Sequence, residues 1–408
     1  MDTDTRSWHV AGRGRSRLAA GVLGVVIMTL ASCSSSAPSP RASSPGVTKS
    51  TISIGLDVPI TGIGFSLGSG VEKQAQLYWK WEAAHGKKIV GRTVQLSVHN
   101  DQFSSSVATQ VCASEAPNSF IMLGWQGSNV IGACAQYANS QGVPYIARGL
   151  DAAFGKYRTY FALSPSYPHE GELVARWMRQ HMGARPGSKV GFITYNTSEF
   201  NGLNNAFSAE ARSLGLTVVP AQRISLTAGI AESQAAALAM KNSGAQYVYL
   251  DLAKQMFTVL STFQAQSYYP HIVLYGANAE VKAICGLLGP NKAEVYAPSP
   301  APELDYARAH DPNFFKAWSE YIGGQPTDIG LYFWWEMKAV AAMLETTGNP
   351  LTRARFIQRV EHSTIATTLM APIHYTAADH IAATKEWMLR LDCTSGQFLT
   401  AANVSSGA

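Results

Sequence analysis

Apolar runs and amphipathic stretches alternate along most of the chain after residue 50, beginning with a β-branched run at 51–56 and a helical pattern at 70–84. Continuous or alternating apolar residues predict strands, and apolar residues three or four apart predict helices. The elements predicted next are a strand at 93–99, a helix at 107–115, a strand at 120–124, a helix at 130–139 and a strand at 143–146. Such a series predicts a parallel sheet with helices on both faces.

A second series of the same kind follows the segment 165–168. It comprises a helix at 169–182, a strand at 189–195, a helix at 204–214, strand 216–220, helix 231–240, strand 247–251, helix 255–266 and strand 271–275. The two series predict an α/β protein with two doubly wound parallel-sheet lobes.

The remaining sequence offers no third sheet. Three helices are predicted at 314–322, 331–346 and 352–361, and a hairpin-type pair of strands at 371–380 and 386–393. Helices without a sheet must cover an existing lobe and extra strands must join an existing edge, so we expect several crossings between the lobes.

The composition supports two ordinary cores and gives no sign of a nucleic-acid partner. The chain has 408 residues, 46% of them hydrophobic and 14% charged. Its first 32 residues carry four Arg and two Asp, so without them the net charge falls from +5 to +3. No Lys/Arg cluster is present to follow a phosphate backbone.

The N-terminus indicates export. A basic segment (Arg13, Arg15, Arg17) precedes an apolar run at 18–30, which is typical of a signal peptide. The run ends in Leu-Ala-Ser-Cys33, which resembles a bacterial lipobox and implies lipidation of Cys33; an ordinary cleaved signal or a membrane stub is the alternative. We therefore expect a signal peptide over 1–32, a Ser/Pro-rich tether over 33–50, and an extracytoplasmic protein anchored to the cell membrane.

Four further cysteines remain: Cys112, Cys134, Cys285 and Cys393. Outside the cytoplasm an even set indicates disulfides, and four cysteines allow three pairings that sequence cannot separate. We favour Cys112–Cys134 and Cys285–Cys393, because each bond would then lie within one lobe. Their spacings are not those of a zinc site, so no metal is expected.

One ordered set of segments is informative: 54–62, 99–101, 124–128, 141–146, 314–321 with 324–326, and 371–375 with 379–380. In this order they resemble periplasmic binding proteins of the leucine/isoleucine/valine class, the receptors of ABC importers. The resemblance implies the type I periplasmic-binding-protein fold, with three crossovers near 164–168, 297–302 and 363–369. The lobes would then be 51–166 plus 298–365, and 167–297 plus 366–408, with a small solute bound between them.

The resemblance places ligand contacts in loops after the strands of the first lobe, where open α/β sheets bind ligands. Gly127 and Ser128, with Asn129 beside them, match a backbone and hydroxyl contact to a carboxylate, although Ser128 is equally an N-cap. Leu150 matches a backbone contact, and Phe65 an aromatic contact or a packed loop residue.

Two positions depart from the family's amino-acid clamp. Asp151 stands where a second hydroxyl would meet the ligand carboxylate, and Asn278 stands near the acid that would meet its ammonium. Two carboxylates about 4 Å apart repel by about 4 kcal/mol at an effective dielectric near 20. Either Asp151 holds an ammonium, or the ligand is not an amino acid.

In the second lobe, Glu199, Phe200 and Asp251 follow strands and are further candidate ligand contacts, with loop capping or solvation as the alternative. The sequence has no GxSxG or HExxH motif, and the glycines at 62, 64 and 68 miss the dinucleotide spacing. We expect a monomeric, non-enzymatic solute receptor without a cofactor, whose partners are a small-molecule solute and an ABC permease. A sensor of the same fold, signalling to a membrane partner, is the alternative, and a secreted α/β enzyme is a remote one.

Overall fold

A computed structural model describes residues 44–62, 66–198, 200–275 and 281–405. The expected signal peptide, Cys33 and most of the tether lie outside the described residues. The last residues of the expected tether pack against the folded part: Val47 is 7% exposed and forms a β-bridge with Ile52. The backbone of Gly46 also accepts a hydrogen bond of 2.7 Å from Ser53 N. The folded part therefore begins earlier than the predicted residue 51.

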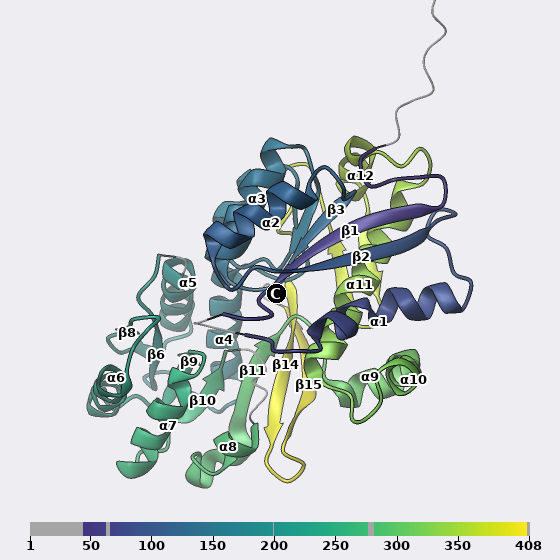
Figure 1. The fold of residues 1–408 in the computed structure, drawn as a ribbon. Coiled ribbons are helices and arrows are strands. Elements are labelled where there is room, and N and C mark those ends of the chain that lie inside the picture. Colours follow the sequence, from purple (N-terminus) through teal and green to yellow (C-terminus); the bar gives the residue numbers. More distant parts are fainter. Residues whose placement is uncertain (1–43, 63–65, 199, 276–280, 406–408) are drawn as a thin grey trace, which may run out of the picture. The chain divides into compact units, whose positions relative to one another are not determined.

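The first sheet has five parallel strands in the order β2-β1-β3-β4-β5 (Figure 1). The strands are β1 (Thr51–Val58), β2 (Thr93–Asn100), β3 (Ile121–Gly124), β4 (Tyr145–Ala147) and β5 (Tyr160–Ala162). After β1 the chain forms β2 on one side of it and then β3 on its other side. The strand order therefore reverses here, and a topological switch point lies between β1 and β3. Ligands of open α/β sheets bind beyond the carboxyl ends of strands at such a point.

Helices cover both faces of the first sheet, as predicted. On one face lie α2 (Ser105–Glu115) and α3 (Ser128–Ser140), and on the other α1 (Val71–Ala84) and α11 (Asp328–Thr347) (Figure 1). Successive strand residues point to opposite faces. Met122 accordingly belongs to the core under α2 and α3, whereas Leu123 belongs to the core under α1 and α11.

The second sheet has the order β15-β14-β11-β10-β9-β6-β7, and β8 also pairs with β6. Its strands are β6 (Lys189–Tyr195), β7 (Thr217–Val218), β8 (Gln222–Ile224), β9 (Tyr247–Asp251), β10 (His271–Leu274), β11 (Val295–Ser299), β14 (Lys385–Asp392) and β15 (Gln397–Ser405). All pair in parallel except β14 with its two neighbours. The predicted strand 216–220 is shortened to β7, which ends before Pro220, a residue without an N–H for a sheet ladder; β8, which follows Pro220, was not predicted.

The remaining helices follow the predicted series, with a few additions. They are α4 (Tyr167–Gln180), α5 (Phe200–Ser213), α6 (Ile230–Ser243), α7 (Gln255–Ala265), α8 (Val281–Cys285), α9 (Leu304–His310), α10 (Pro312–Tyr321), α12 (Arg353–Val360) and the short 3-10 turns η1 (Ala152–Lys156) and η2 (Gly289–Glu294). Residues of α10, α11 and α12 join the core of the first sheet. Helices without strands of their own thus complete an existing layer.

The predicted hairpin of 371–380 with 386–393 is wrong. β13 (Met370–His374) pairs with β12 (Thr364–Thr367), and β14 pairs with β11 and β15. The expected third crossover at 363–369 falls inside the β12–β13 hairpin, whose residue Ile373 is part of the first-sheet core. The chain therefore passes to the second sheet later, close to Ala383 and Lys385. Both predicted segments do form strands, but neither pairs with the other.

Both disulfides have the pairing favoured from the sequence. Cys112–Cys134 joins α2 to α3, and Cys285–Cys393 joins the end of α8 to the residue after β14. Each bond thus lies beside a single sheet.

Candidate functional site

The loop after β3 presents the best-defined of the predicted contacts. Gly127 adopts a φ of 87°, which L side chains disfavour, and Ser128 begins α3. Ser128 is 5% exposed, and its Oγ has no hydrogen-bond partner among the described residues. An unused hydroxyl at a helix N-terminus suits an anionic group. Asn129, by contrast, is exposed.

Phe103 is a neighbour of this loop that sequence reasoning missed. A Cβ added to Gly127 would lie 2.8 Å from Cε2 of Phe103, so the ring packs directly on the glycine. Phe103 itself has a φ of 55°, and its N–H donates to Asp101 Oδ1 at 2.6 Å. The positive φ of a bulky residue was not visible in the sequence pattern.

The loop after β4 is held against the first crossover between the sheets. The N–H of Gly149 donates to Ser164 Oγ at 2.9 Å, and the carbonyl of Leu150 accepts from Tyr167 N at 2.7 Å. The Leu150 carbonyl is therefore already engaged. Asp151 Oδ1 accepts from Ala153 N at 2.8 Å and caps η1. The described contact of Asp151 is thus a capping contact.

On the second sheet, Phe200 is buried and packs on Tyr167, with 5.0 Å between ring centroids. Asp251 is also buried and accepts a hydrogen bond of 3.0 Å from Thr194 Oγ1. The structure therefore gives Phe200 a packing partner on α4 and Asp251 a hydrogen-bonding partner on β6. Phe65, Glu199 and Asn278, the other predicted contacts, lie outside the described residues.

Arg148 connects the two sheets and was not singled out from the sequence. It follows β4 and is 9% exposed. Its Nη1 lies 3.4 Å from both Gln126 Oε1 and Tyr275 Oη, and the guanidinium lies over the Tyr275 ring at 5.8 Å from the centroid. Gln126 belongs to the first sheet's loops, whereas Tyr275 follows β10. The signal was weak, because a single Arg in a short loop is usually solvated.

Two buried glutamates lie in the electrostatic environment of Arg148. Glu170 on α4 accepts a hydrogen bond from the Tyr249 hydroxyl, and burial raises the pKa of Glu170. Burial also raises the pKa of Glu386 on β14 well above its usual range, and the charge of Glu170 adds to the rise. Both carboxyls therefore favour the neutral form more than exposed glutamates do.

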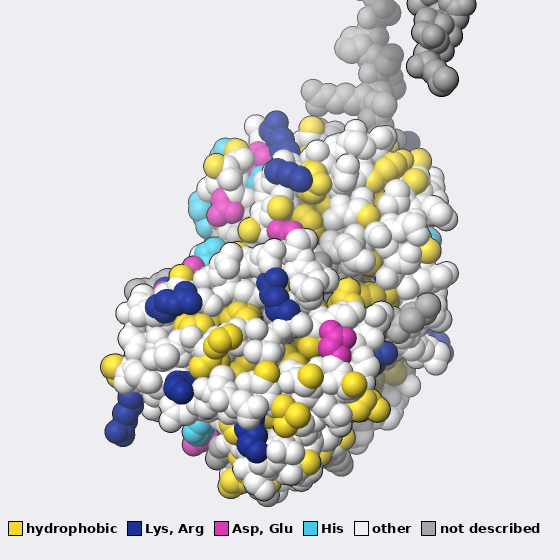
Figure 2. Space-filling model, turned by 90° about the vertical axis from the view of Figure 1, so that its left-hand side faces the viewer, with side chains coloured by type: hydrophobic (Ala, Val, Ile, Leu, Met, Phe, Trp, Pro, Cys, Tyr) yellow, Lys and Arg dark blue, Asp and Glu magenta, His cyan; other side chains and the backbone are white. Residues whose placement is uncertain are grey.

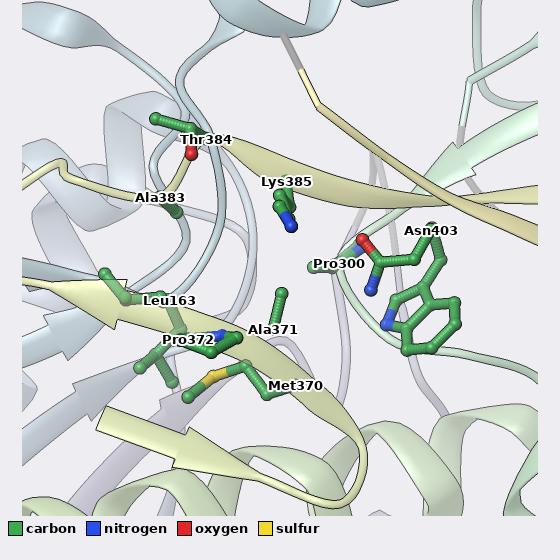
Figure 3. Close-up of a pocket in the computed structure, with 11 residues that line it drawn as sticks. Leu163, Pro300, Met370, Ala371, Pro372, Ala383, Thr384, Lys385 and Asn403 are labelled. Atoms are coloured by element: carbon green, nitrogen blue, oxygen red, sulfur yellow. The ribbon is translucent and has the colours of Figure 1, made fainter. Parts of the chain in front are cut away.

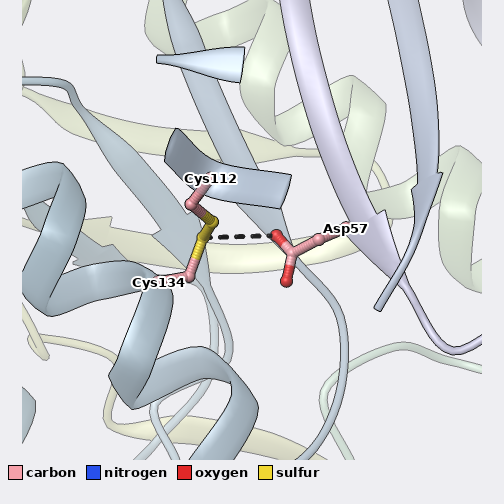
Figure 4. Close-up of side chains that lie close together, drawn as sticks. All are labelled: Asp57, Cys112 and Cys134. Atoms are coloured by element: carbon pink, nitrogen blue, oxygen red, sulfur yellow. Dashed lines mark hydrogen bonds between the residues drawn. A yellow bond between two sulfur atoms is a disulfide. The ribbon is translucent and has the colours of Figure 1, made fainter. Parts of the chain in front are cut away.

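A second buried acidic group lies beneath the switch point. Asp57 is the next-to-last residue of β1, and its Oδ1 lies 3.8 Å from Cys134 Sγ in the Cys112–Cys134 disulfide (Figure 4). Among the residues that the structure describes, these three are the one His/Cys/Asp/Glu group with ligand atoms close enough together for a metal ion. Because both sulfurs are bonded to each other, they offer no thiolates to a metal.

A small cavity lies where the chain crosses between the sheets. Its volume is about 10 Å³, the size of one water molecule. Leu163, Pro300 and Lys385, one from each crossing, are among its lining residues (Figure 3). The cavity is far too small for a solute.

Two further observations concern the surface and the described helices. On the face drawn in Figure 2, Lys and Arg side chains are dispersed among polar and hydrophobic ones. Of the helices in the described ranges, none is both long and apolar enough to cross a bilayer.

Two α/β sheets joined by three crossings, with loops from both meeting around Arg148, define a two-lobed solute-binding protein. The sequence profile of the periplasmic binding protein family matches residues 51–397, so the chain belongs to that family. No curated protein matches the chain.

Solved structures share the fold at low sequence identity. A fatty acid ABC transporter substrate-binding protein from Thermomonospora curvata is 18% identical, with a TM-score of 0.75, covering 90% of this chain and 95% of that one. A possible leucine/isoleucine/valine-binding protein from Rhodopirellula baltica is 15% identical, with a TM-score of 0.72 and coverage of 87% and 97%. A branched chain amino acid ABC transporter from Thermus thermophilus with bound valine is 14% identical, with a TM-score of 0.71 and coverage of 88% and 98%.

These matches confirm the predicted type I periplasmic-binding-protein fold and the leucine/isoleucine/valine-type resemblance. The family binds solutes outside the cytoplasm for ABC importers and is not enzymatic.

Proposed function

We propose that the chain is an extracytoplasmic receptor that captures a small polar solute, an amino acid or a related compound, between its two lobes and delivers it to an ABC importer. Lipid on Cys33 holds it to the cell membrane, and one chain acts as a monomer. Ser128 and the loop 148–151 form the contact surface of the first lobe.

The observation that supports this proposal best is the contact of Arg148 with Tyr275. It joins the loop after β4 in the first sheet to the residue after β10 in the second. A ligand shifts an opening equilibrium only if it binds the closed form better than the open one. A solute that touches Arg148 on one lobe and Tyr275 on the other has that preference.

The names of similar proteins support a small solute. One names a fatty acid transporter, one a possible leucine/isoleucine/valine-binding protein, and one contains valine. All three solute types carry a carboxylate and an apolar body. A compound of that kind is the solute we favour.

Ligand capture is tested by thermal unfolding of the purified chain with amino acids, their amides, polyamines, fatty acids and aromatic acids. A true ligand at 100 times its Kd stabilises the folded state by about 2.7 kcal/mol, a clear rise in Tm. Small-angle scattering with the same compound should show a smaller radius of gyration. Turnover of a compound, with no stabilisation by any class, would refute the proposal.

Delivery and anchoring need separate measurements in cells. Deletion of the gene should abolish uptake of the radiolabelled ligand; unchanged uptake with a lost transcriptional response would indicate the sensor instead. Cys33→Ser should release the chain from the membrane fraction and abolish labelling by an alkyne fatty acid. A chain that stays labelled after this substitution would contradict lipidation at Cys33.

A further inference from the structure

Arg148 is a buried cation that makes no ion pair with any of the described residues. Its described hydrogen-bond acceptors, Gln126 Oε1 and Tyr275 Oη, are both neutral and both lie at 3.4 Å, the long end for a hydrogen bond. Its Nε is buried and has no acceptor in the described part of the chain. A guanidinium carries five N–H donors and stays protonated in proteins. Burying such a charge unpaired is costly.

The neighbouring carboxyls do not remove this deficit. Glu170 and Glu386 interact electrostatically with Arg148, but neither makes an ion pair within 4.0 Å of it in the described structure. Glu170 is engaged by Tyr249, and burial favours the neutral form of both acids. Among the described residues, no acceptor with a full negative charge lies within hydrogen-bond distance of the guanidinium Nε.

The surroundings of Arg148 are aromatic and come from both lobes. Tyr167, Tyr275 and Tyr332 are its electrostatic neighbours, from the starts of α4 and α11 and from the end of β10. Phe200 packs on Tyr167, and Trp125 lies 4.2 Å from Tyr332 between ring centroids. Aromatic faces suit an apolar or aromatic body rather than a polar one.

We propose that Arg148 binds the carboxylate of the solute, and that the solute is a carboxylic acid with an apolar body for which an α-ammonium group is not required. This rests on the proposed function and names its substrate class. A carboxylate matches the planar fork of the guanidinium and can accept two parallel hydrogen bonds from it. It also supplies the missing charge in a place that both lobes enclose.

The same assignment explains the two departures from the amino-acid clamp. With the carboxylate on Arg148, Asp151 can cap η1 without repelling the ligand. Asn278 then needs no carboxylate, because no ammonium has to be paired. The family's amino-acid clamp would instead have a hydroxyl at the position of Asp151 and an acid near Asn278.

The test uses isothermal titration of the purified full chain with matched compounds. 4-Methyl-2-oxopentanoate, phenylacetate and octanoate are compared with leucine, phenylalanine and octanamide. We expect one or more of the acids to bind and octanamide not to bind. Arg148→Gln should weaken the acid at least about 100-fold, as expected for loss of one partner of a buried charge pair. Arg148→Lys should retain part of the affinity, and Arg359→Gln, an exposed arginine on α12, should retain all of it.

A stability measurement separates ligand binding from a structural role. Because Arg148 lacks a charged partner in the described structure, Arg148→Gln should unfold at the same Tm as the parent chain or higher without ligand, and should lose only the rise that the acid produces. A Tm drop of more than 5 °C without ligand would assign Arg148 to structure and overturn the inference.

The outcomes distinguish this inference from the proposed function. If leucine or another amino acid binds and its deaminated counterpart does not, the substrate class is wrong while solute capture stands. The same holds if Arg148→Gln binds the ligand as tightly as the parent chain. If no compound of any class binds or stabilises the chain, the proposed function itself fails.

Discussion

The hydroxyl of Tyr145 donates a hydrogen bond of 3.3 Å to Asp57 Oδ1, beside the disulfide that joins α2 to α3. Both residues are buried, and the other oxygen of Asp57 has no partner in the described residues. Burial raises the pKa of Asp57, and the nearby charge of Asp101 adds to the rise. The first lobe thus contains acids that fold more readily in the protonated form.

Stability should therefore fall as pH rises from about 4 to about 6. Burial raises the pKa of Asp101 to about 6, whereas an unfolded Asp titrates near 3.9. A raised carboxyl pKa contributes stability that is complete below pH 4 and lost as pH passes 6. Asp101 alone accounts for a loss of about 2–3 kcal/mol, and the raised pKa of Asp57 acts in the same direction. Urea unfolding at pH 4.5, 6 and 7.5 measures it.

Asp101→Asn is the matched variant, because an amide oxygen can still accept from the Phe103 N–H. Its urea midpoint should change less between pH 5 and 7 than that of the parent chain. Glu72→Gln, at an exposed acid on α1, is the control and should leave the pH dependence as it is. Equal slopes for the parent chain and Asp101→Asn would show that Asp101 is ionised without penalty.

The two disulfides should contribute unequally to stability. Cys112–Cys134 closes a separation of 22 residues and Cys285–Cys393 one of 108. The loop-entropy model gives about 3 kcal/mol for the first and about 5 kcal/mol for the second. Double Cys→Ser variants of each pair, compared by urea unfolding, should show the larger loss for Cys285 and Cys393. The reverse order would mean that strain or packing, not loop closure, dominates.

Gly127→Ala should impair both folding and solute binding. The new Cβ would sit 2.8 Å from the Phe103 ring, at a φ of 87° that disfavours any side chain. Strain of this kind costs about 1–3 kcal/mol, read as a lower urea midpoint. Gly86→Ala is the control, since Gly86 also has a positive φ (71°) but no atom within 4 Å of the added Cβ. If both variants lose equally, the Phe103 contact carries no cost.

The sequence pattern predicted the two sheets because each of their strands is a short unbroken run of apolar or β-branched residues. The buried run of β3 and the β-branched β1 each specify a strand within a few residues, and the alternation with helices sets the parallel order. The predicted pairing of β13 with β14 was wrong because each strand forms a hairpin with another neighbour, β12 and β15 respectively, that the pattern did not predict. β14 also pairs with β11, where Ser299 lies opposite Trp387, and a partner so distant in the chain leaves no local trace. β11, which receives β14, lies in a segment expected to be only a crossover.

The site was predicted less well than the fold, for a related reason. Loop positions such as Ser128 follow from strand ends, which the sequence indicates. The importance of Arg148 depends on which groups surround it after folding, and Tyr275 and Glu386 lie more than 100 residues away in the chain. Nothing in the residues next to Arg148 predicts that its charge is buried.

A buried amide on α5 offers a test of how completely the second lobe is packed. Asn204 is 5% exposed, yet neither its Oδ1 nor its Nδ2 has a hydrogen-bond partner among the described residues. It lines an open groove of about 520 Å³ between α5 and the β7–β8 edge. An unpaired buried polar group costs about 1–3 kcal/mol, which an apolar side chain of similar size avoids.

Asn204→Leu should therefore raise the free energy of unfolding by about 1 kcal/mol or more, measured by urea titration at pH 6. Asn205→Leu is the control, because this neighbour is exposed and its change should be close to zero. A loss of stability in Asn204→Leu would mean that water in the groove already satisfies the amide. In that case the groove floor is hydrated, and the apparent deficit of Asn204 carries no energetic cost.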